Sequence, residues 1–310
     1  MTQHSSPVVD GADPAIRLRD VELGYGGHRV VGPVDLDIPR GRMTVMIGAN
    51  GCGKSTLLRG LTRQIPLMAG SIEVLGKDSS GIGARDYART VALLPQSPVV
   101  PEHTTVAQLV ERGRYPHRSW FGARSRQDEA AIAEAVGRTG LVDLLDRDVA
   151  ELSGGQRQRA WLALVLAQRT PIVLLDEPMS FLDMSHQVEL LDLVGTLTDP
   201  TNPTGPADPT VPTVPTGDGA PPVLSGPAEA APQPRRATVV AVLHELSLAA
   251  RCADHIVAVH NGQIAAQGDP ADVITPDVLR EVFGLHADVI TDPLLGHPVV
   301  LPRSEKEAQP

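Results

Sequence analysis

A glycine-rich loop is the first feature of this sequence whose residue types and spacing point to a definite chemistry. The pattern G-x-x-x-x-G-K-S/T is matched by Gly48-Ala49-Asn50-Gly51-Cys52-Gly53-Lys54-Ser55, between an apolar run and a helical pattern, as a phosphate-binding loop requires. Glycines let successive backbone N–H groups face an anion, and the dipole of the following helix favours negative charge there. Lys54 can reach the terminal phosphates of a nucleotide, and the Ser55 hydroxyl can ligate Mg²⁺. The residues predicted to bind nucleotide are Gly48, Asn50, Gly51, Cys52, Gly53, Lys54, Ser55 and Thr56.

Two carboxylates end a second apolar run. Residues 172–175 are all apolar, and Asp176 and Glu177 follow them. At the carboxyl edge of a parallel sheet, this strand end would lie near the phosphate loop. Asp176 is predicted to hold Mg²⁺. If the strand pleat continues, Glu177 points to the opposite side, where it could orient or deprotonate an attacking water.

A pair of glycines opens a later helix, in the run Leu152-Ser153-Gly154-Gly155-Gln156. Ser153 and Gln156 have the spacing of a capping box, but a capping box does not require two glycines. Glycines at a helix N-terminus expose backbone N–H groups, which makes this position a second candidate anion site. The chain therefore contains two phosphate-binding features that lie far apart in the sequence.

Alternating strands and helices would position these residues. The expected strands are 16–25, 30–38, 41–48, 71–75, 90–94, 172–175 and 238–243, followed by a terminal hairpin of 256–260 and 263–266. The expected helices are 55–63, 104–114, 127–137, 153–168, 186–197 and 246–252. Strands interleaved with helices predict an α/β fold with a largely parallel sheet.

The composition narrows the class of protein. The 310 residues are 42% hydrophobic and 21% charged, which is ordinary for a globular chain. A net charge of −10 argues against a broad nucleic-acid surface. Two cysteines, Cys52 and Cys252, exclude a disulfide framework and fit a reducing compartment. No apolar run approaches the ~20 residues of a membrane span, and the N-terminus lacks signal-peptide features, so we expect a soluble cytoplasmic protein.

One segment departs from this composition. Residues 198–236 contain 11 of the 28 prolines and few large apolar side chains. Such a segment cannot offset its ordering entropy, so we predict a disordered insertion, which we favour as a tolerated surface loop over a partner-binding PxxP site. Disordered tails are expected at 1–14 and 303–310, and residues 15–302 are expected to form one domain.

The sequence resembles the ATP-binding cassette (ABC) ATPases. Leu152-Ser153-Gly154-Gly155-Gln156 is similar to their signature motif. In the order that the family shows, Tyr25 resembles the aromatic residue that stacks on adenine, and Gln96 resembles the Q-loop glutamine. Asp183 resembles the D-loop aspartate, and His244 resembles the switch histidine.

This resemblance implies a fold and a set of roles. The implied fold is an α/β P-loop ABC-type ATPase domain with a mixed sheet core, an antiparallel β subdomain and a helical signature subdomain at about residues 97–170. It implies a head-to-tail homodimer, with ATP between the phosphate loop of one copy and the signature motif of the other. ATP and Mg²⁺ are the implied cofactors. The implied catalytic residues are Glu177, His244, Lys54 and Gln96. The implied metal ligands are Ser55, Gln96 and Asp176. The residues implied to contact ATP across the dimer are Ser153, Gly154, Gly155 and Gln156.

Two further stretches resemble the ATPase subunits of iron–siderophore, haem and vitamin B12 importers. One is Gly113-Arg114-Tyr115-Pro116-His117, which otherwise reads as a helix end with a proline stop. The other is C-terminal and consists of residues 282–285 and 292–298. This resemblance implies a peripheral subunit at the cytoplasmic face of the cell membrane. It would energise iron–siderophore uptake through a separate permease, docked near residues 96–120, and would act indirectly with a periplasmic or lipoprotein substrate-binding protein.

Other functions stay open at this point. One is the ATPase of a haem or cobalamin importer. A function of a different class is that of a soluble ABC ATPase acting on nucleic acid or ribosomes, against which the net charge of −10 argues.

We expect deletion of residues 200–234 to leave ATPase activity largely intact, because the insertion follows a helix and carries none of the predicted site residues. Phosphate release by the full chain and the deleted chain would be compared under the same conditions. A large loss of activity in the deleted chain would mean that the insertion is not passive.

Overall fold

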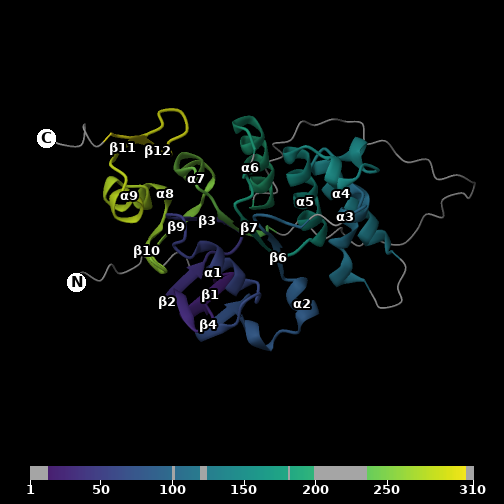
Figure 1. Ribbon diagram of the computed structural model, residues 1–310, viewed down its shortest axis with the longest axis horizontal. Coiled ribbons are helices and arrows are strands. Elements are labelled where there is room, and N and C mark those ends of the chain that lie inside the picture. The colour runs from purple at the N-terminus through teal and green to yellow at the C-terminus, as the bar shows by residue number, and fades with distance from the viewer. Residues whose placement is uncertain (1–12, 100–101, 119–123, 181, 199–235, 305–310) are drawn as a thin grey trace, which may run out of the picture.

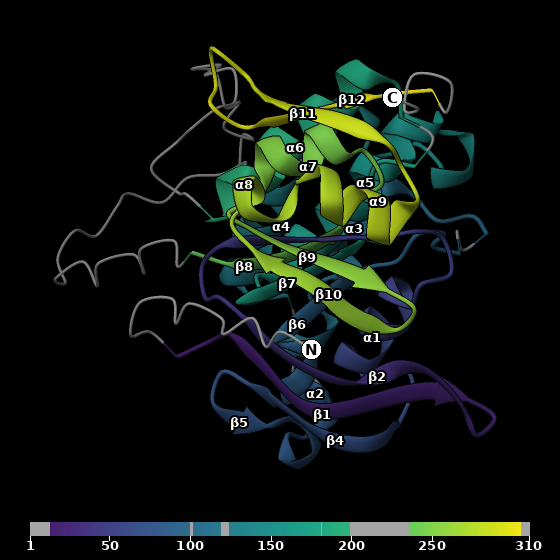
Figure 2. The ribbon, with the colours of Figure 1, turned by 90° about the vertical axis from the view of Figure 1, so that its left-hand side faces the viewer.

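Two sheets and a group of helices organise the described part of the chain. The computed structural model describes residues 13–99, 102–118, 124–180, 182–198 and 236–304. Figure 2 shows an antiparallel sheet at the bottom, a six-stranded sheet in the middle, and helices with a small hairpin above. Residues 1–12, 199–235 and 305–310 lie outside the described residues, so the expectation of disorder in them remains a prediction.

The antiparallel sheet is formed by the first strands of the chain. Its order is β2-β1-β4-β5, with β1 at Ile16–Tyr25, β2 at His28–Ile38, β4 at Leu67–Val74 and β5 at Lys77–Asp78. Alternation of apolar and polar residues buries one face: Leu18 and Leu36 lie opposite one another and are almost fully buried. The strands predicted from this alternation are confirmed.

The six-stranded sheet carries the strand ends on which the site depends. Its order is β10-β9-β3-β8-β7-β6. The bounds are β3 Met43–Ile47, β6 Val91–Leu94, β7 Ile172–Asp176, β8 Thr238–Val242, β9 His255–His260 and β10 Gln263–Gly268. Every pair is parallel except β9 with β10. Every residue of β3, β7 and β8 is buried, as expected of parallel strands covered on both faces.

Helices cover both faces of this sheet. On one side α1 (Lys54–Leu61) packs between the two sheets, where Leu57, Leu58 and Leu61 join the apolar cluster of the antiparallel strands. The elements above the other face in Figure 2 are α6 (Met184–Thr198), α7 (Leu246–Cys252), α8 (Pro270–Val273) and α9 (Pro276–Phe283). The short helix α2 (Ala84–Ala88) precedes β6.

The end of the chain differs from the sequence prediction. We expected a terminal hairpin at 256–266, but α8, α9 and a further hairpin of β11 (Ala287–Thr291) and β12 (Pro298–Pro302) follow it. These elements are four to eight residues long, shorter than the windows of about 11–18 residues over which hydrophobic periodicity is counted. Arg303, which we placed in the terminal tail, donates its backbone N–H to the His286 carbonyl at 2.8 Å.

A separate helical subdomain packs around its own apolar cluster. It contains α3 (Val106–Arg112), α4 (Arg126–Arg138) and α5 (Gly154–Gln168), with short 3₁₀ helices at Tyr115–His117, Val142–Leu144 and Val149–Glu151. Each long helix begins with a capping box, formed by Thr105 and Gln108, Ser125 and Asp128, and Ser153 and Gln156. No helix in the described residues has both the length and the apolar character needed to cross a membrane.

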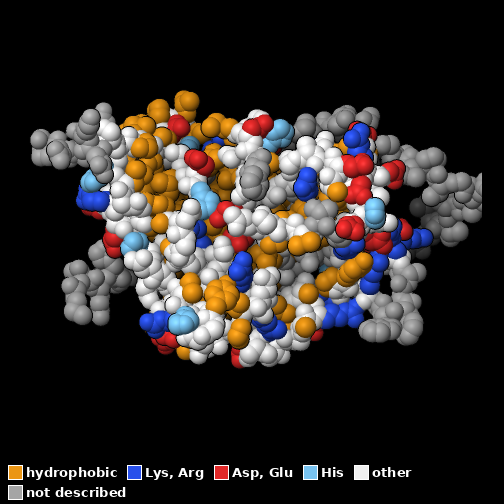
Figure 3. All heavy atoms as spheres, in the orientation of Figure 1, with side chains coloured by type: hydrophobic (Ala, Val, Ile, Leu, Met, Phe, Trp, Pro, Cys, Tyr) orange, Lys and Arg blue, Asp and Glu red, His pale blue; other side chains and the backbone are white. Residues whose placement is uncertain are grey.

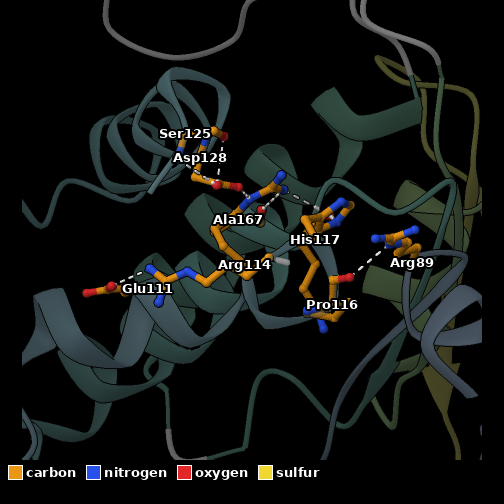
Figure 4. A network of polar contacts seen from close by, with 10 residues as sticks. Arg89, Glu111, Arg114, Pro116, His117, Ser125, Asp128 and Ala167 are labelled. Atoms are coloured by element: carbon orange, nitrogen blue, oxygen red, sulfur yellow. Dashed lines mark hydrogen bonds and ion pairs between the residues drawn. The ribbon is translucent and has the colours of Figure 1, made fainter. Parts of the chain in front are cut away.

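The run Gly113-Arg114-Tyr115-Pro116-His117 holds this subdomain together (Figure 4). Gly113 ends α3 against α5, where a Cβ atom would lie 2.3 Å from the Leu164 carbonyl oxygen. The buried Arg114 side chain donates from Nε to Asp128 Oδ1 at 2.8 Å and from Nη1 to the Ala167 carbonyl at 2.7 Å. The run is therefore more than a helix stop, because it ties α3, α4 and α5 together.

The same run also joins the helical subdomain to the sheet domain. Arg85 of α2 and Arg89 each donate from Nε to the Pro116 carbonyl, at 2.9 and 2.8 Å. His117 Nε2 lies 2.8 Å from the Gln168 carbonyl. Burial, and then the positive charge of Arg114, lower the pKa of His117, so its ring is neutral at pH 7 and donates one hydrogen bond. The contacts at Pro116 therefore connect the helical subdomain to the sheet domain, and we call this region the joint.

We expect Arg114→Met to lower the free energy of unfolding by about 3–5 kcal/mol, because it leaves Asp128 buried without its cation. Burial alone would raise the pKa of Asp128, but hydrogen bonds from Arg114 and Ser125 lower it to about 2. The pair therefore stabilises the fold above the ordinary aspartate pKa, and its contribution is lost as the pH falls towards 2. Urea unfolding of wild type and variant at several pH values measures both effects.

The matched control is the double variant Arg114→Met, Asp128→Leu, which removes both charges and should recover most of the loss near pH 7. A single variant within about 1 kcal/mol of wild type at neutral pH would contradict a structural role for this ion pair.

Candidate active site

The phosphate loop joins β3 to α1. Gly48, Cys52, Gly53, Lys54 and Thr56 are buried, whereas Asn50 and Gly51 are exposed, and Ser55 is half-buried; all are residues predicted to bind nucleotide. The Lys54 ammonium donates to the Gly48 carbonyl at 2.7 Å and to the Ala49 carbonyl at 3.0 Å. The loop therefore curls around a cation at the start of a helix, which is the arrangement that attracts a phosphate group.

Ser55 and Asp176 bring the loop and the acidic strand end together. The Ser55 hydroxyl donates to Asp176 Oδ1 at 3.0 Å, joining α1 to the last residue of β7. Burial raises the pKa of Asp176, although the hydrogen bond from Ser55 lowers it. Two oxygen groups of the kind that Mg²⁺ prefers thus lie side by side next to the phosphate loop.

The Glu177 carboxylate is held by residues that follow the two strands on either side of β7. Gln96, after β6, donates from Nε2 to Glu177 Oε2 at 2.6 Å. His244, after β8, lies with Nε2 at 2.6 Å from Glu177 Oε1. The Glu177 side chain is only 16% exposed. Three of the four residues that we predicted to be catalytic, Glu177, Gln96 and His244, therefore meet at one carboxylate beside Asp176.

The reason we gave for the direction of Glu177 was wrong. We expected the strand pleat to continue and to turn the side chain away from Asp176, but β7 ends at Asp176 and Glu177 has a φ of 50°. The left-handed backbone at Glu177, rather than strand alternation, therefore sets where its carboxylate points.

Tyr25 lies beside the phosphate-loop helix. It is the last residue of β1, its side chain is 42% exposed, and its hydroxyl accepts a hydrogen bond from Arg59 Nη1 of α1 at 3.1 Å. Burial opposes ionisation of the phenol, but hydrogen bonds with Thr56 and Arg59 lower the pKa of Tyr25 below its ordinary value. An exposed aromatic ring thus flanks the helix that starts at Lys54.

The signature residues form a second group. Ser153 Oγ accepts the N–H of Gln156, and Gln156 Oε1 accepts the N–H of Ser153, so the predicted capping box is confirmed. A hollow of about 280 Å³ is lined by Ser153, Gly155, Gln156, Arg159, Leu182, Asp183 and His186. Hydrogen bonds from the His186 backbone N–H, its ring and the Ser185 hydroxyl lower the pKa of Asp183 to about 2. Sequence reasoning did not single out Arg159 or His186 as site residues. Arg159 lies in the run that continues the signature motif, and the local signal for His186 was Asp183 three residues before it.

Among the described residues, the two groups lie apart. Figure 1 shows α1 beside the antiparallel strands, and α5 with α3 and α4 further to the right. Within the part of the chain that the structure describes, no hydrogen bond joins Ser153, Gly154, Gly155 or Gln156 to the phosphate loop. One bond does link α5 to the acidic strand end, from Gln158 Nε2 to the Pro178 carbonyl at 2.7 Å.

Comparison with known proteins identifies the family. The family model described as "ABC transporter" matches residues 31–180. The "Probable siderophore transport system ATP-binding protein YusV" of Bacillus subtilis is 41% identical, over 93% of this chain and 92% of that protein. The chain belongs to the ABC transporter ATP-binding proteins. The "Ferric enterobactin transport ATP-binding protein FepC" of Escherichia coli is 38% identical, over 93% of each chain.

Two other relatives are named for the import of different substrates. The "Cobalamin import ATP-binding protein BtuD" of Halobacterium salinarum is 36% identical, over 93% of this chain and 63% of that protein. The "Hemin import ATP-binding protein HmuV" of Rhodococcus jostii is 34% identical, over 94% of this chain and 87% of that protein. Among solved structures, a metal-chelate type ABC transporter in an inward-facing conformation matches with a TM-score of 0.72 and 22% identity, over 95% of this chain and all of that chain.

This membership confirms the expected fold class, an α/β P-loop ATPase with a mixed sheet and an antiparallel sheet. It also establishes the chemistry, because ABC transporter ATP-binding proteins bind and hydrolyse ATP. The phosphate loop, Asp176, Glu177, Gln96 and His244 make up the candidate active site of this ABC ATPase.

We expect Glu177→Gln to bind ATP about as tightly as wild type and to hydrolyse it about 10²–10⁴-fold more slowly, the usual contribution of a general base. The amide keeps the size of the side chain but cannot accept a proton at neutral pH. Steady-state phosphate release and equilibrium ATP binding would measure the two effects.

Glu245→Gln is the matched control, because Glu245 is an exposed carboxylate one residue after His244 and caps no backbone N–H of α7. It should hydrolyse ATP at the wild-type rate. Near-normal turnover of Glu177→Gln would remove Glu177 from the reaction.

Proposed function

We propose that this ABC ATPase energises the uptake of an iron–siderophore or related iron chelate through a separate membrane permease. The names of two relatives that match over almost their whole length, one for siderophores and one for ferric enterobactin, support this cargo. The observation that carries the hydrolytic role is the Glu177 carboxylate, held by Gln96 and His244 beside the phosphate loop.

In this proposal Glu177 is the general base. Its carboxylate orients the attacking water and accepts a proton from it as the oxygen attacks the γ-phosphate. His244 and Gln96 hold the carboxylate, and His244 keeps the γ-phosphate and the water in register. Lys54 neutralises charge that develops on the phosphate oxygens, which is the main source of catalysis in phosphoryl transfer.

The donor groups beside the loop fit Mg²⁺. Ser55 and Asp176 place oxygen atoms next to one another, and the Gln96 amide lies against Glu177, the residue after Asp176. We propose that these three residues hold the ion together with the nucleotide phosphates. When bound, Mg²⁺ would supply positive charge that offsets the negative charge developing on the nucleotide phosphates.

The separation of the two groups supports a homodimer. A complete site would need the phosphate loop of one copy and Ser153, Gly154, Gly155 and Gln156 of the other, arranged head to tail around ATP. The hollow beside the signature helix also contains Asp183, which fits a D-loop residue at the same junction. Tyr25 would stack on adenine at the other end of the nucleotide.

The permease is proposed to dock at the joint between the two parts of the fold, on the cytoplasmic face of the membrane. Tyr115 is 58% exposed there, next to the network that holds the helical subdomain. A periplasmic or lipoprotein substrate-binding protein would act through the permease and would not contact this chain.

Two observations argue against a nucleic-acid or ribosomal partner. The net charge is −10. On the face in Figure 3, the basic side chains that the structure describes are interspersed with acidic ones and form no continuous band. A haem or cobalamin cargo is the second candidate, because relatives at 34% and 36% identity bear those names.

The test is affinity capture from detergent-solubilised native membranes, with tagged Glu177→Gln chain as bait in the presence of ATP and Mg²⁺. We expect a polytopic permease in the eluate. Tyr115→Ala in the same bait should reduce its recovery, whereas Val142→Ala, also an exposed apolar side chain of the helical subdomain, should not.

The outcomes separate the candidates. The binding protein that works with the recovered permease would be tested for affinity for ferric siderophores, haem and cobalamin, and preference for haem or cobalamin would overturn the proposed cargo. Recovery of ribosomal or nucleic-acid proteins alone would overturn the transport role and leave the ATPase assignment in place.

A further inference from the structure

A two-residue turn far along the chain contacts the back of the phosphate loop. Asn261 and Gly262 connect β9 to β10, with φ angles of 49° and 75°, as in a type I′ hairpin. The Gly262 N–H donates to the Cys52 carbonyl of the phosphate loop at 2.9 Å. This bond fixes the direction of one peptide group in the loop.

That peptide group joins Cys52 to Gly53. A peptide is planar and trans, so its C=O and its N–H point in opposite directions. Because the Cys52 carbonyl faces the turn, the Gly53 N–H faces the other side of the loop. Within the described part of the chain that N–H has no acceptor, although Gly53 is buried and its own carbonyl accepts the N–H of Leu57.

The turn is itself held against the antiparallel sheet. The Gly262 carbonyl accepts the N–H of Gly32 at 2.8 Å, and Gln263 Nε2 donates to the Gly32 carbonyl at 2.6 Å. The approach leaves no room for a side chain, because a Cβ atom on Gly262 would lie 2.2 Å from the Val30 carbonyl oxygen. Figure 2 shows the β9–β10 hairpin above α1 and the strands of the antiparallel sheet.

We propose that the Asn261–Gly262 turn is a positioning element of the ATPase, which aims the Gly53 N–H at the phosphates of the bound nucleotide. Gly262 and Gln263 are positioning residues, since they act through the loop and touch no phosphate. This inference rests on the nucleotide-binding site proposed above.

The test compares two glycines that have the same backbone conformation. Gly262 and Gly76 both have a φ of 75° in two-residue turns, but a Cβ atom at Gly76 would meet nothing within 4 Å. Gly262→Ala and Gly76→Ala therefore share the conformational strain, and only Gly262→Ala must shift the turn, because its Cβ atom would clash with Val30 of β2.

We expect the full-length Gly262→Ala chain to bind ATP and ADP about tenfold more weakly than Gly76→Ala, a change equivalent to about 1.4 kcal/mol. KM for ATP should rise with little change in kcat, because the lost contact stabilises the bound nucleotide equally in the ground state and in the transition state. A role in folding alone would lower the melting temperature without nucleotide and leave both Kd values unchanged.

Gln263→Leu covers the case in which Gly262→Ala does not fold. It removes the bond to Gly32 without a clash, and we expect a rise of about threefold in Kd for ATP. Equal ATP affinity in Gly262→Ala and Gly76→Ala would overturn the proposal, as would unchanged affinity in Gln263→Leu if Gly262→Ala is unfolded.

Lys54→Ala separates this proposal from the site on which it rests. If Lys54→Ala binds ATP as wild type does, the proposed phosphate site is itself wrong. If Lys54→Ala loses ATP and Gly262→Ala matches its control, only the role of the turn fails.

Discussion

The active site depends on one edge of the six-stranded sheet, where four parallel strands end in register. Leu94 of β6 pairs with Leu175 of β7, Asp176 pairs with Val242 of β8, and Val242 pairs with Met46 of β3. The residues that follow these strands therefore converge, although they come from distant parts of the sequence. A slip of one residue would turn every side chain of the slipped strand to the opposite face, so the buried apolar pattern of each strand also fixes the site.

Positively and negatively charged groups lie on adjacent sides of the site at this edge of the sheet. Lys54 and the start of α1 make one side cationic, while Asp176 and Glu177 make the adjacent side anionic. Burial raises the pKa of Asp176, which means that the carboxylate is held in a place where its charge is poorly solvated. A bound cation would relieve that cost. The environment of Glu177 differs from that of Asp176, because Gln96 and His244 contact the two Glu177 carboxylate oxygens and hold the side chain in one orientation. Groups held in advance need little reorganisation during the reaction.

The parts that could be predicted from sequence were those with a local signal. The phosphate loop, β3 and β7 combine a motif with a buried apolar run, and the capping box of Ser153 and Gln156 has a recognisable three-residue spacing. The direction of Glu177 could not be predicted, since its positive φ appears only once the strand has ended. The contact of Gly262 with Cys52 joins residues more than two hundred positions apart, and no local pattern records it. The hollow that brings Arg159 of α5 together with His186 of α6 likewise depends on how the two helices pack.

Helix α5 connects the signature residues, the catalytic strand end and the joint at Pro116, which the proposed transport cycle would have to couple. Its N-terminus carries the signature capping box, and Gln158 in its first turns binds the Pro178 carbonyl, next to Glu177. At its other end the Ala167 and Gln168 carbonyls bind Arg114 and His117, which adjoin the joint at Pro116. Fifteen helical residues span roughly 22 Å, and a packed helix of that length moves as a rod. One continuous helix therefore links the joint at Pro116 to Ser153, and Gln158 links the same helix to the residues that follow β7. If the permease docks as proposed above, α5 is the direct structural connection between the docked partner and the catalytic strand end.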